Sequence, residues 1–469
     1  MFRPEQTSTP DARTSDQSGE GLVTKVSKDA TLCPALFISA TASGQGKTTI
    51  TAGLARYHRN QGRKVRVFKT GPDYLDPLIL EQAAGSPAEQ LDLWMVGKKR
   101  CRHFLYQAAQ EADLILIEGV MGLYDGDPSG ADLAEYFGIP VVAIISAPTM
   151  AQTVGAIALG LRQYRPSLPF AGIIANSLGS DRHGELIKES MPETIPLLGC
   201  LKKQDALILP QRHLGLVRPH ELEGYDDKLN HIADIIESAG LNTLPAPVKF
   251  FDEDEEQDSH DAENHSNSLA GVKIGIARDE AFSFIYPANL KLLKRLGAEL
   301  HFFSPCSDQT LPEVDSLWLP GGYPELHLET LSKNLPMRQA IRSFYQQGHK
   351  ILAECGGMLY AQQSIITLDQ QEWPMAGLIP GIGVMRTKGG CQGMQSAALP
   401  EGELRGHAHH RSKSEETLPA IAFGKRIKHP APGEPVVRSK GLTASYLHFY
   451  FPSNQAATIR LFHPDEVLS

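Results

Sequence analysis

The stretch that decides the fold is "ISATASGQGKTTIT", residues 38–51, in which an apolar run leads into small residues and then Gly-Lys-Thr-Thr. The apolar run predicts a strand over 35–40, and the pattern after Thr49 predicts a helix that ends before Gly62. A glycine-rich turn between a buried strand and a helix presents backbone N–H groups to an anion. Thr41 stands where phosphate-binding loops usually carry their first glycine, so an ordinary turn before a surface helix is the alternative.

The loop residues predict a site for ATP and Mg²⁺. We expect Lys47 to reach the β- and γ-phosphates and the Thr48 hydroxyl to ligate the metal. The predicted ATP-binding residues are Ser43, Gly44, Gln45, Gly46, Lys47, Thr48 and Thr49.

Acidic side chains follow two other predicted strands. "DLILIEGV", 113–120, contains Glu118, and "FKTGPDYLDP", 68–77, contains a D-Y-L-D sequence at 73–76. Two acids in a turn are usually only solvated. Next to a phosphate loop, at a strand end, Glu118 and Asp73 are better explained as ligands of Mg²⁺ or of its water.

The composition excludes some classes of protein. The chain has 469 residues and a formal net charge of −9, which argues against a nucleic-acid-binding surface. It lacks the run of about 18 apolar residues that a membrane span requires. The six cysteines have no paired spacing, which is typical of a reducing compartment. We therefore expect a cytoplasmic protein of several domains with small-molecule partners, and neither nucleic acid nor membrane.

A strongly acidic segment divides the chain. "FFDEDEEQDSHDAENHSNSLAG", 250–271, has eight acidic residues and few apolar ones, which predicts a linker. The polar first 30 residues lack the apolar core of a signal peptide and predict a flexible tail. The predicted organisation is a disordered tail over 1–32, a domain with the phosphate loop over 33–249, an acidic linker over 250–270 and a second domain over 271–469.

Both halves alternate short apolar runs with helical stretches. Runs of Val, Ile and Leu without strict alternation indicate strands buried on both faces. The predicted fold class is α/β, with two domains that each contain a mostly parallel sheet flanked by helices. The runs are "ALFISA", "KVRVFKT", "DLILIEGV", "PVVAIISA" and "FAGIIANS" in the first half, and "VKIGIARD", "ELHFFSP", "SLWLPGG" and "KILAECGG" in the second.

Longer motifs are similar to one enzyme family. They include "FKTGPDYLDP", "EGVMGLYDG" and "NSLGSDRHGELI" before the acidic segment, and "LPGGYPELH", "ECGGMLY" and "SYLHFYFPSN" after it. Over residues 35–455 the chain resembles the cobyrinic acid a,c-diamide synthases, glutamine amidotransferases of corrinoid biosynthesis. The resemblance implies a P-loop domain akin to dethiobiotin synthetase, followed by a class I glutaminase domain. Phosphate loops of this family tolerate a residue such as Thr41.

The resemblance also implies the reaction. ATP would phosphorylate the a and c acetate carboxylates of cobyrinic or hydrogenobyrinic acid, and ammonia from L-glutamine would displace the phosphate. We expect Thr48, Glu118 and Asp73 to bind Mg²⁺, and we expect an exposed Tyr74 and Leu75 to support the macrocycle. The predicted substrate-binding residues are Asp73, Tyr74, Leu75 and Asp125. A homodimer is compatible with the sequence, which does not fix the number of subunits.

"ILAECGGMLY", 351–360, predicts a strand, then a cysteine at a tight turn, then a helix. This is the pattern of a nucleophile elbow, in which the helix N-terminus favours the thiolate of Cys355. "LWLPGGYPE" places glycines at another strand end, so backbone N–H groups of Gly322 and Gly356 are the predicted oxyanion hole. A buried structural cysteine is the alternative for Cys355. The other cysteines lack such surroundings.

His448 in "SYLHFYF" is the predicted general base, since the family motif surrounds it and a Cys–His pair suits a thiol glutaminase. Three histidines compete for this role: His407, His409 and His410. In the wider superfamily a glutamate follows two residues after the histidine, but this chain has Tyr450 there. The group that orients His448 is therefore not that carboxylate.

Three alternatives to this function stay open. A related amidotransferase could act on another tetrapyrrole, such as a nickel-sirohydrochlorin or a cobyric acid precursor. A partitioning-type ATPase would carry a second lysine early in the loop, where this chain has Ala42 and Ser43. A P-loop ATPase with a non-catalytic glutaminase-like module is the third, because the segment 385–395 and Gln455 depart from the family pattern.

Overall fold

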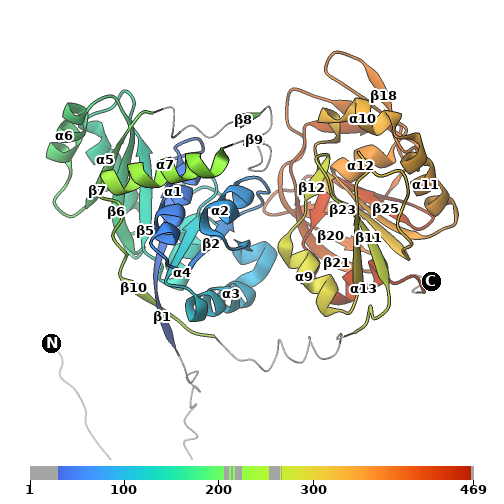
Figure 1. The fold of residues 1–469 in the computed structure, drawn as a ribbon, viewed down its shortest axis with the longest axis horizontal. Coiled ribbons are helices and arrows are strands. Elements are labelled where there is room, and N and C mark those ends of the chain that lie inside the picture. Colours follow the sequence, from blue (N-terminus) through green and yellow to red (C-terminus); the bar gives the residue numbers. More distant parts are fainter. Residues whose placement is uncertain are drawn as a thin grey trace, which may run out of the picture.

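The computed structural model describes residues 30–204, 207, 211–212, 215–216, 224–252, 265 and 267–465. The chain forms two domains that lie side by side, the N-terminal one blue to green and the C-terminal one yellow to red (Figure 1). Each domain contains a central sheet with helices packed on both faces. The predicted α/β class with two domains is confirmed.

The N-terminal sheet has the strand order β3-β2-β4-β1-β5-β6-β7, and these strands are parallel. Their bounds are β1 Thr31–Ala40, β2 Val65–Thr70, β3 Ala88–Leu91, β4 Leu114–Glu118, β5 Val141–Ser146, β6 Phe170–Leu178 and β7 Leu197–Lys202. An antiparallel strand, β10 (Pro247–Phe250), pairs with the start of β1. Because of this pairing Thr31 and Leu32, which we expected in the tail, and Phe250, which we expected in the linker, belong to this domain.

Helices cover both faces of the N-terminal sheet. Ile, Leu and Ala side chains of α1 (Lys47–Asn60), α2 (Asp76–Ala84) and α7 (Tyr225–Ser238) form one core cluster with the sheet. Those of α3 (Lys98–Glu111) and α4 (Gly130–Phe137) form another. Helices α5 (Thr153–Tyr164) and α6 (Asp181–Ser190) pack against β5 and β6. The sheet is therefore buried on both faces, as its apolar runs predicted.

The C-terminal sheet begins as a parallel sheet and continues as an antiparallel one. Strands β13, β11, β14, β16 and β25 pair in parallel in that order. An antiparallel extension, β24-β23-β20-β21-β26, continues the sheet and was not among the predicted strands. The bounds are β11 Lys273–Ala277, β13 Glu299–Phe303, β14 Ser316–Leu319, β16 Lys350–Glu354, β20 Gly393–Leu399, β21 Gly402–Ala408, β23 Ala420–Arg426, β24 Pro435–Ser439, β25 Leu442–Ser445 and β26 Leu447–Phe449.

Helices and small sheets complete the C-terminal domain. One core cluster includes α10 (Leu328–Lys333), α11 (Leu335–Gln346) and α12 (Gly356–Ala361), and another includes α9 (Pro287–Arg295) and α13 (Gln455–Phe462). Strand β12 (Phe282–Phe284) pairs with β15 (Gly321–Gly322). A further small sheet contains β17 Ser364–Ile366, β18 Glu372–Pro374, β19 Ile382–Met385 and β22 Ser412–Glu415, and a two-stranded sheet contains β8 Gln211–Arg212 and β9 Gly215–Leu216.

Much of the predicted tail and linker lies outside the described residues, which omit 1–29, 253–264 and 266. The end of the expected linker belongs to the C-terminal domain, because Leu269 is fully buried in its core. In the described part of the chain no helix combines the length and the hydrophobicity needed to cross a bilayer.

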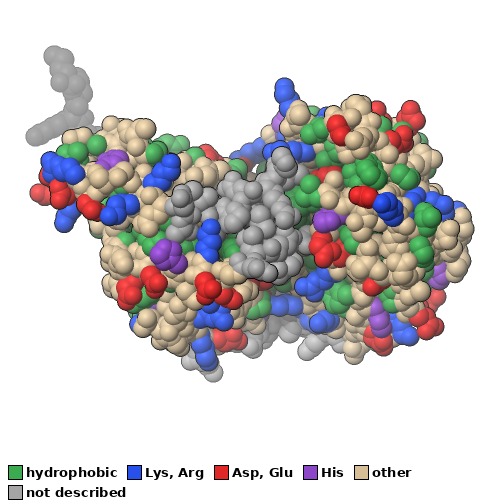
Figure 2. Space-filling view, turned by 45° about the horizontal axis from the view of Figure 1, so that its top comes forward, with side chains coloured by type: hydrophobic (Ala, Val, Ile, Leu, Met, Phe, Trp, Pro, Cys, Tyr) green, Lys and Arg blue, Asp and Glu red, His purple; other side chains and the backbone are tan. Residues whose placement is uncertain are grey.

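The two domains share an apolar contact. Tyr286 and Tyr450 of the C-terminal domain are buried in one cluster with Phe68 and Met95 of the N-terminal domain. Ion pairs and hydrogen bonds surround it, including Arg405 Nη1 to the Trp94 carbonyl at 2.6 Å. On the face shown in Figure 2, charges of both signs are interspersed over the two lobes. The domain boundary is therefore packed like a protein core rather than held by surface charges alone.

Candidate functional site

The phosphate loop is held in shape by neighbouring strand ends. Gly46 has a φ of 96°, and a Cβ there would lie 2.5 Å from Nδ2 of Asn176. That amide donates to the Gln45 carbonyl at 2.9 Å, and Gln45 Oε1 accepts from the Ser146 N–H at 2.9 Å. Glycine is required at residue 46 because the backbone is left-handed and the space is filled.

Lys47 at the start of α1 folds back onto the loop. Its Nζ donates to the carbonyls of Met121 at 2.6 Å and Ala42 at 3.1 Å. Burial is the largest cause of its lowered pKa, and the Lys69 ammonium adds to this effect. Among the described residues the amine hydrogen-bonds only to these neutral carbonyls, so an anionic phosphate oxygen would be a stronger acceptor for it.

A buried charged cluster lies beside the loop. Lys69 and Glu118 are register partners on adjacent strands, and Lys69 Nζ donates to Glu118 Oε1 at 2.8 Å and to Asp76 at 2.6 Å. Asp73 is 3.6 Å from the same amine, and Thr48 Oγ1 donates to Glu118 Oε1 at 2.7 Å. The structure thus brings together the three predicted metal ligands. Lys69 was missed, and its only sequence signal was its place four residues before Asp73.

The protonation of the cluster follows from its burial. Burial alone would lower the pKa of Lys69, but Glu118, Asp76 and Asp73 outweigh it and raise that pKa. Burial, and then the Asp76 carboxylate, raise the pKa of Asp73 to about 7. Burial would also raise the pKa of Asp76, but its contact with Lys69 lowers it. Burial raises the pKa of Glu118. Lys69 therefore stays protonated, and the carboxyl groups of Glu118, Asp73 and Asp76 share its positive charge.

The donors at this site fit Mg²⁺. Oxygen ligands are what this ion prefers, and Glu118 Oε2 is a buried oxygen without a hydrogen-bond partner among the described residues. The Thr48 hydroxyl and the Asp73 carboxylate are the other oxygens that could join it.

The expected exposure of Tyr74 and Leu75 is wrong, whereas the substrate-binding roles of Tyr74, Leu75 and Asp125 stay predictions. Leu75 is only 9% exposed, and the Tyr74 ring stacks on Phe284 of the other domain at 4.8 Å, although both residues line the cavity described below. Asp125 is exposed, accepts the Gly122 N–H at 3.0 Å, and is not among the described residues that line the cavity below. The sequence could not show that Tyr74 is covered, because Phe284, which stacks on it, lies more than 200 residues later in the chain.

One cavity of about 970 Å³ connects the two domains. The N-terminal domain contributes the whole phosphate loop, Lys69 and residues 70–76. The C-terminal domain contributes Phe284, Tyr323, residues 392–394, residues 407–409 and His448. The departure from the family pattern at 385–395 therefore lies partly on the wall of this cavity. The phosphate loop and a histidine of the second domain thus face the same space.

Cys355 occupies the predicted elbow between β16 and α12. Its backbone has φ 47° and ψ −104°, and its N–H donates to the Ser445 carbonyl at 2.7 Å. A Cβ at Gly357 would overlap the Leu319 carbonyl, so the turn requires glycine there. A Cβ at Gly356 would lie 3.0 Å from the Gly322 nitrogen. The predicted oxyanion-hole residues Gly322 and Gly356 are therefore neighbours.

The expected thiolate is wrong for this state of the protein. Burial, and then the Glu325 carboxyl, raise the pKa of Cys355, and the Gly356 N–H opposes this only in part. Burial also raises the pKa of the other five thiols, so geometry and not acidity distinguishes Cys355. A helix of one and a half turns does not outweigh full burial.

His448 lies in β26, directly opposite His407 of β21. The two rings stack at 4.9 Å with planes 13° apart. Burial, and then His410 and His409, lower the pKa of His448 to about 3. Among the described residues, no hydrogen bond joins it to Cys355, and its buried Nδ1 has no partner. These pKa shifts leave the imidazole and the thiol both neutral near pH 7.

The three competing histidines have other surroundings. His407 Nδ1 bonds the Tyr286 hydroxyl at 2.8 Å, and His410 Nε2 bonds Glu434 at 2.9 Å while its ring stacks on Tyr446. His409 is exposed on the cavity wall. His448 alone among them both lines the cavity and approaches the Gly321 turn, since a Cβ on Gly321 would overlap its ring.

Glu354 was also missed by sequence reasoning. Its Oε1 accepts the Phe449 N–H at 2.7 Å, next to His448, and its Oε2 accepts the Trp318 indole N–H at 2.8 Å. Burial raises the pKa of Glu354 to about 8. This carboxyl fixes β26, which carries His448, to β16, which precedes Cys355.

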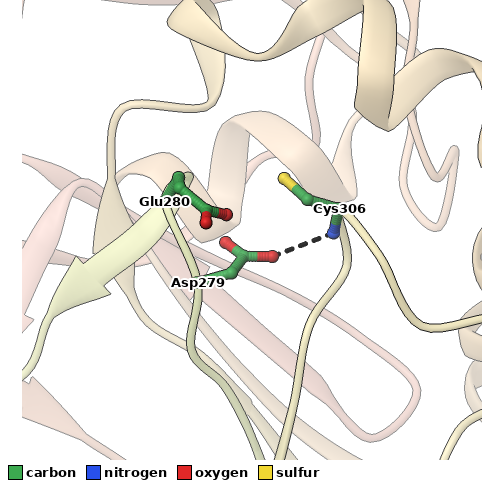
Figure 3. A group of neighbouring side chains, drawn as sticks. All are labelled: Asp279, Glu280 and Cys306. Atoms are coloured by element: carbon green, nitrogen blue, oxygen red, sulfur yellow. Dashed lines mark hydrogen bonds between the residues drawn. The ribbon is translucent and has the colours of Figure 1, made fainter. Parts of the chain in front are cut away.

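A second group of polar side chains lies outside the cavity. The ligand atoms of Asp279, Glu280 and Cys306 are within 4.8 Å of one another (Figure 3). The Asp279 carboxylate already accepts the backbone N–H groups of Ala281, Phe282 and Cys306 and the Ser304 hydroxyl. These bonds give Asp279 a structural role in the loop after β11.

Family comparisons agree with this division of the chain. Residues 36–217 match the CobQ/CobB/MinD/ParA nucleotide binding domain, and residues 273–456 match the CobB/CobQ-like glutamine amidotransferase domain. The chain thus has a nucleotide-binding domain followed by a glutamine amidotransferase domain.

Three curated relatives match over 92% of the chain. The hydrogenobyrinate a,c-diamide synthase of Stutzerimonas stutzeri is 52% identical over 99% of its length, and that of Pseudomonas aeruginosa is 49% identical over 98%. The cobyrinate a,c-diamide synthase of Herminiimonas arsenicoxydans is 49% identical over 97%. The chain therefore belongs to the family of the hydrogenobyrinate and cobyrinate a,c-diamide synthases.

Proposed function

We propose that the protein uses ATP and glutamine to amidate the a and c acetate carboxylates of cobyrinic or hydrogenobyrinic acid. The observation that carries this proposal is the shared cavity, which joins the phosphate loop to His448 of the amidotransferase domain. The names of the related proteins supply the class of substrate. Both the cobalt-containing and the metal-free acid are candidates, because some of the related proteins are named cobyrinate synthases and others hydrogenobyrinate synthases.

In the first step a substrate carboxylate attacks the γ-phosphorus of ATP, which gives an acyl phosphate and ADP. The backbone N–H groups of residues 43–49 bind the phosphates, and Lys47 stabilises the transferring group. Thr48, Glu118 and Asp73 would hold Mg²⁺, which neutralises phosphate charge when bound. The acyl phosphate is needed because a free carboxylate has no adequate leaving group.

In the second step the Cys355 sulfur attacks the side-chain amide of glutamine and releases ammonia. His448 takes the thiol proton and gives it to the leaving nitrogen, and the N–H groups of Gly322 and Gly356 stabilise the oxyanion. Water then hydrolyses the γ-glutamyl thioester to glutamate. Ammonia reaches the acyl phosphate through the shared cavity and displaces inorganic phosphate, and the cycle repeats at the second carboxylate.

The proposal is tested by incubating the full chain with ATP, Mg²⁺, glutamine and each of the two corrinoid acids. Mass spectrometry counts the added amides, and we expect two. Four amides, or none, would reject the assignment. Parallel incubations with a nickel-sirohydrochlorin and a cobyric acid precursor test the related-substrate alternative. ATP hydrolysis without glutamine use would favour the alternative of a non-catalytic glutaminase-like module.

We also propose that the protein acts in the cytoplasm, as its six unpaired cysteines suggest. A homodimer stays a prediction, which light scattering of the purified chain can check.

A further inference from the structure

The glutaminase base lacks the partner that usually orients such a histidine. In nucleophile–base pairs a third group, most often a carboxylate, fixes the ring of the base. Here Nδ1 of His448 is buried without a hydrogen bond among the described residues. Tyr450, two residues later, instead packs against Tyr286 at the domain boundary. Something other than a carboxylate must fix the His448 ring.

Rings surround His448 instead. His407 stacks on it at 4.9 Å, Tyr74 lies at 5.2 Å with its plane tilted by 45°, and Phe284 lies at 6.0 Å. The Gly321 backbone closes the remaining side. Packed aromatic rings prefer particular relative orientations. They can select one orientation of the imidazole.

Of these contacts only Tyr74 belongs to the N-terminal domain. Its ring stacks on Phe284 at 4.8 Å with planes 4° apart. Phe284 pairs with Gly321 in the β12–β15 ribbon, and Phe282 pairs with Gly322. Tyr74 therefore contacts both the base and the ribbon that carries the oxyanion-hole glycine.

The position of Tyr74 depends on the charged cluster. Asp73 accepts the backbone N–H groups of Leu75 and Asp76 at 3.0 and 3.2 Å, which shapes the loop. Asp73 and Asp76 both pair with Lys69, and Lys69 bonds Glu118, the acceptor of the Thr48 hydroxyl. An unbroken series of contacts thus runs from the phosphate loop to His448.

We infer that Tyr74 is a positioning residue of the glutaminase reaction, whose ring orients His448 in place of a carboxylate and makes glutamine hydrolysis responsive to the charged nucleotide site. The inference rests on the proposed function. It predicts that ATP and corrinoid together stimulate glutamine hydrolysis, because a change in the Lys69 cluster moves the loop that carries Tyr74. It also explains how a resting, neutral Cys–His pair is kept from wasting glutamine.

The test compares the full chain with Tyr74→Ala, Tyr74→Leu, Tyr74→Phe and the control Tyr164→Ala. Tyr164 is an aromatic residue of the same domain that is 75% exposed and does not line the cavity. Each protein is assayed with glutamine and with an ammonium salt, and glutamate release is measured with and without ATP plus corrinoid. Thermal melting confirms that each variant is folded, and Tyr74→Leu keeps apolar bulk if the alanine variant is not.

We expect Tyr74→Ala and Tyr74→Leu to lower kcat for glutamine-dependent amidation by about 10- to 100-fold, the usual cost of a misplaced catalytic group. The ratio of the rate of glutamate release with ATP plus corrinoid to the rate without them should fall toward one. Amidation with ammonia should stay within about twofold, because Cys355 and His448 are then bypassed. Tyr74→Phe keeps the ring and should behave as the unmodified protein does, as should Tyr164→Ala.

Several results would overturn the inference. Unchanged stimulation in Tyr74→Leu would mean that the ring does not position His448. Equal loss with glutamine and ammonia would place Tyr74 in the N-terminal reaction alone, and a raised KM for the corrinoid with ammonia would make it a substrate-binding residue. If the unmodified protein amidates no corrinoid with either nitrogen source, the proposed function itself fails, which is a separate outcome.

Discussion

The phosphate loop and Cys355 have surroundings of opposite character, charged at the loop and neutral at the cysteine. Around the phosphate loop, Lys69 pairs with three carboxyls and Thr48 bonds one of them. Around Cys355 the thiol and the His448 imidazole are neutral, and stacked rings replace ion pairs. Phosphoryl transfer moves much charge and needs fixed charges to stabilise it. A buried thiol attacking an amide needs exact placement first and acquires charge only during the reaction.

The comparison also indicates which activity should be lost when each region is changed separately. Under the proposed function the first region would supply the acyl phosphate, and the second would supply only ammonia, which can also come from solution. A change in the second region should therefore be bypassed by an ammonium salt, whereas a change in the first should not. The following predictions test this division, from the largest expected effect to the smallest.

Cys355→Ala should lose glutamine-dependent amidation by on the order of 10⁴-fold or more, as other enzymes do without their nucleophile. No sulfur remains to form the γ-glutamyl thioester. Amidation with an ammonium salt at raised pH, where more NH₃ is present, should persist. Mass spectrometry of the corrinoid measures both. Loss with both nitrogen sources would indicate that Cys355 is structural, and retention of both would remove the glutaminase assignment.

Lys47→Ala should lower amidation with either nitrogen source by on the order of 10³-fold, the scale for removing a cation that stabilises a transferring phosphoryl group. The reason is that no acyl phosphate forms, so ammonia cannot rescue the variant. The matched control is Lys202→Ala, which removes an exposed lysine of the same domain. Normal ammonia-dependent turnover in Lys47→Ala would reject the phosphate-loop assignment.

Lys69→Met tests the charged cluster as a structural unit. It leaves buried carboxyls without their cation, so the free energy of unfolding should fall by about 3–5 kcal/mol. Added Mg²⁺ should restore part of this loss if Glu118 and Asp73 bind the ion. Urea denaturation with and without Mg²⁺ gives both values. Lys202→Met, at an exposed pair with Asp181, should cost less than about 1 kcal/mol, and equal losses in the two variants would contradict the cluster's role.

His448→Ala should lower glutamine hydrolysis by about 10²-fold or more, the usual contribution of a general base. Ammonia-dependent amidation should continue, and His409→Ala should be near normal. Because the pKa of His448 is lowered to about 3, the imidazole is neutral at every assay pH above that value. The pH profile of glutamine hydrolysis in the unmodified protein should therefore show no histidine limb near pH 6.5, and such a limb would show that His448 is more exposed in solution.

Asp125→Asn should change little, within about twofold in kcat and in KM for the corrinoid, since the side chain is exposed and is not among the described residues that line the cavity. The asparagine side-chain oxygen can still accept the Gly122 N–H that Asp125 accepts. Steady-state kinetics with ammonia as the nitrogen source measures both constants. A strong rise in KM for the corrinoid would support the substrate-binding role that the sequence predicts for Asp125.

Local features of both sites were predictable because each is contained in one short stretch. The strand, turn and helix around Lys47 and around Cys355 follow from apolar runs, glycines and the helix pattern within about a dozen residues. Glu118 and Asp73 were predictable as neighbours because parallel strands end at the same edge of a sheet. The α/β class and the division into two domains were predictable from the composition and from the alternation of apolar runs with helical stretches.

Sequence alone therefore determined the two reactive centres, since their chemistry depends on residues that are close along the chain. Tertiary structure decided which charges and rings surround them. The register of β2 against β4 pairs Lys69 with Glu118, and the packing of the two domains places Tyr74 against Phe284 and His448. Burial then reversed the expected ionisation of Cys355. Such contacts join segments from 49 to more than 300 residues apart, and no local pattern of residues encodes them.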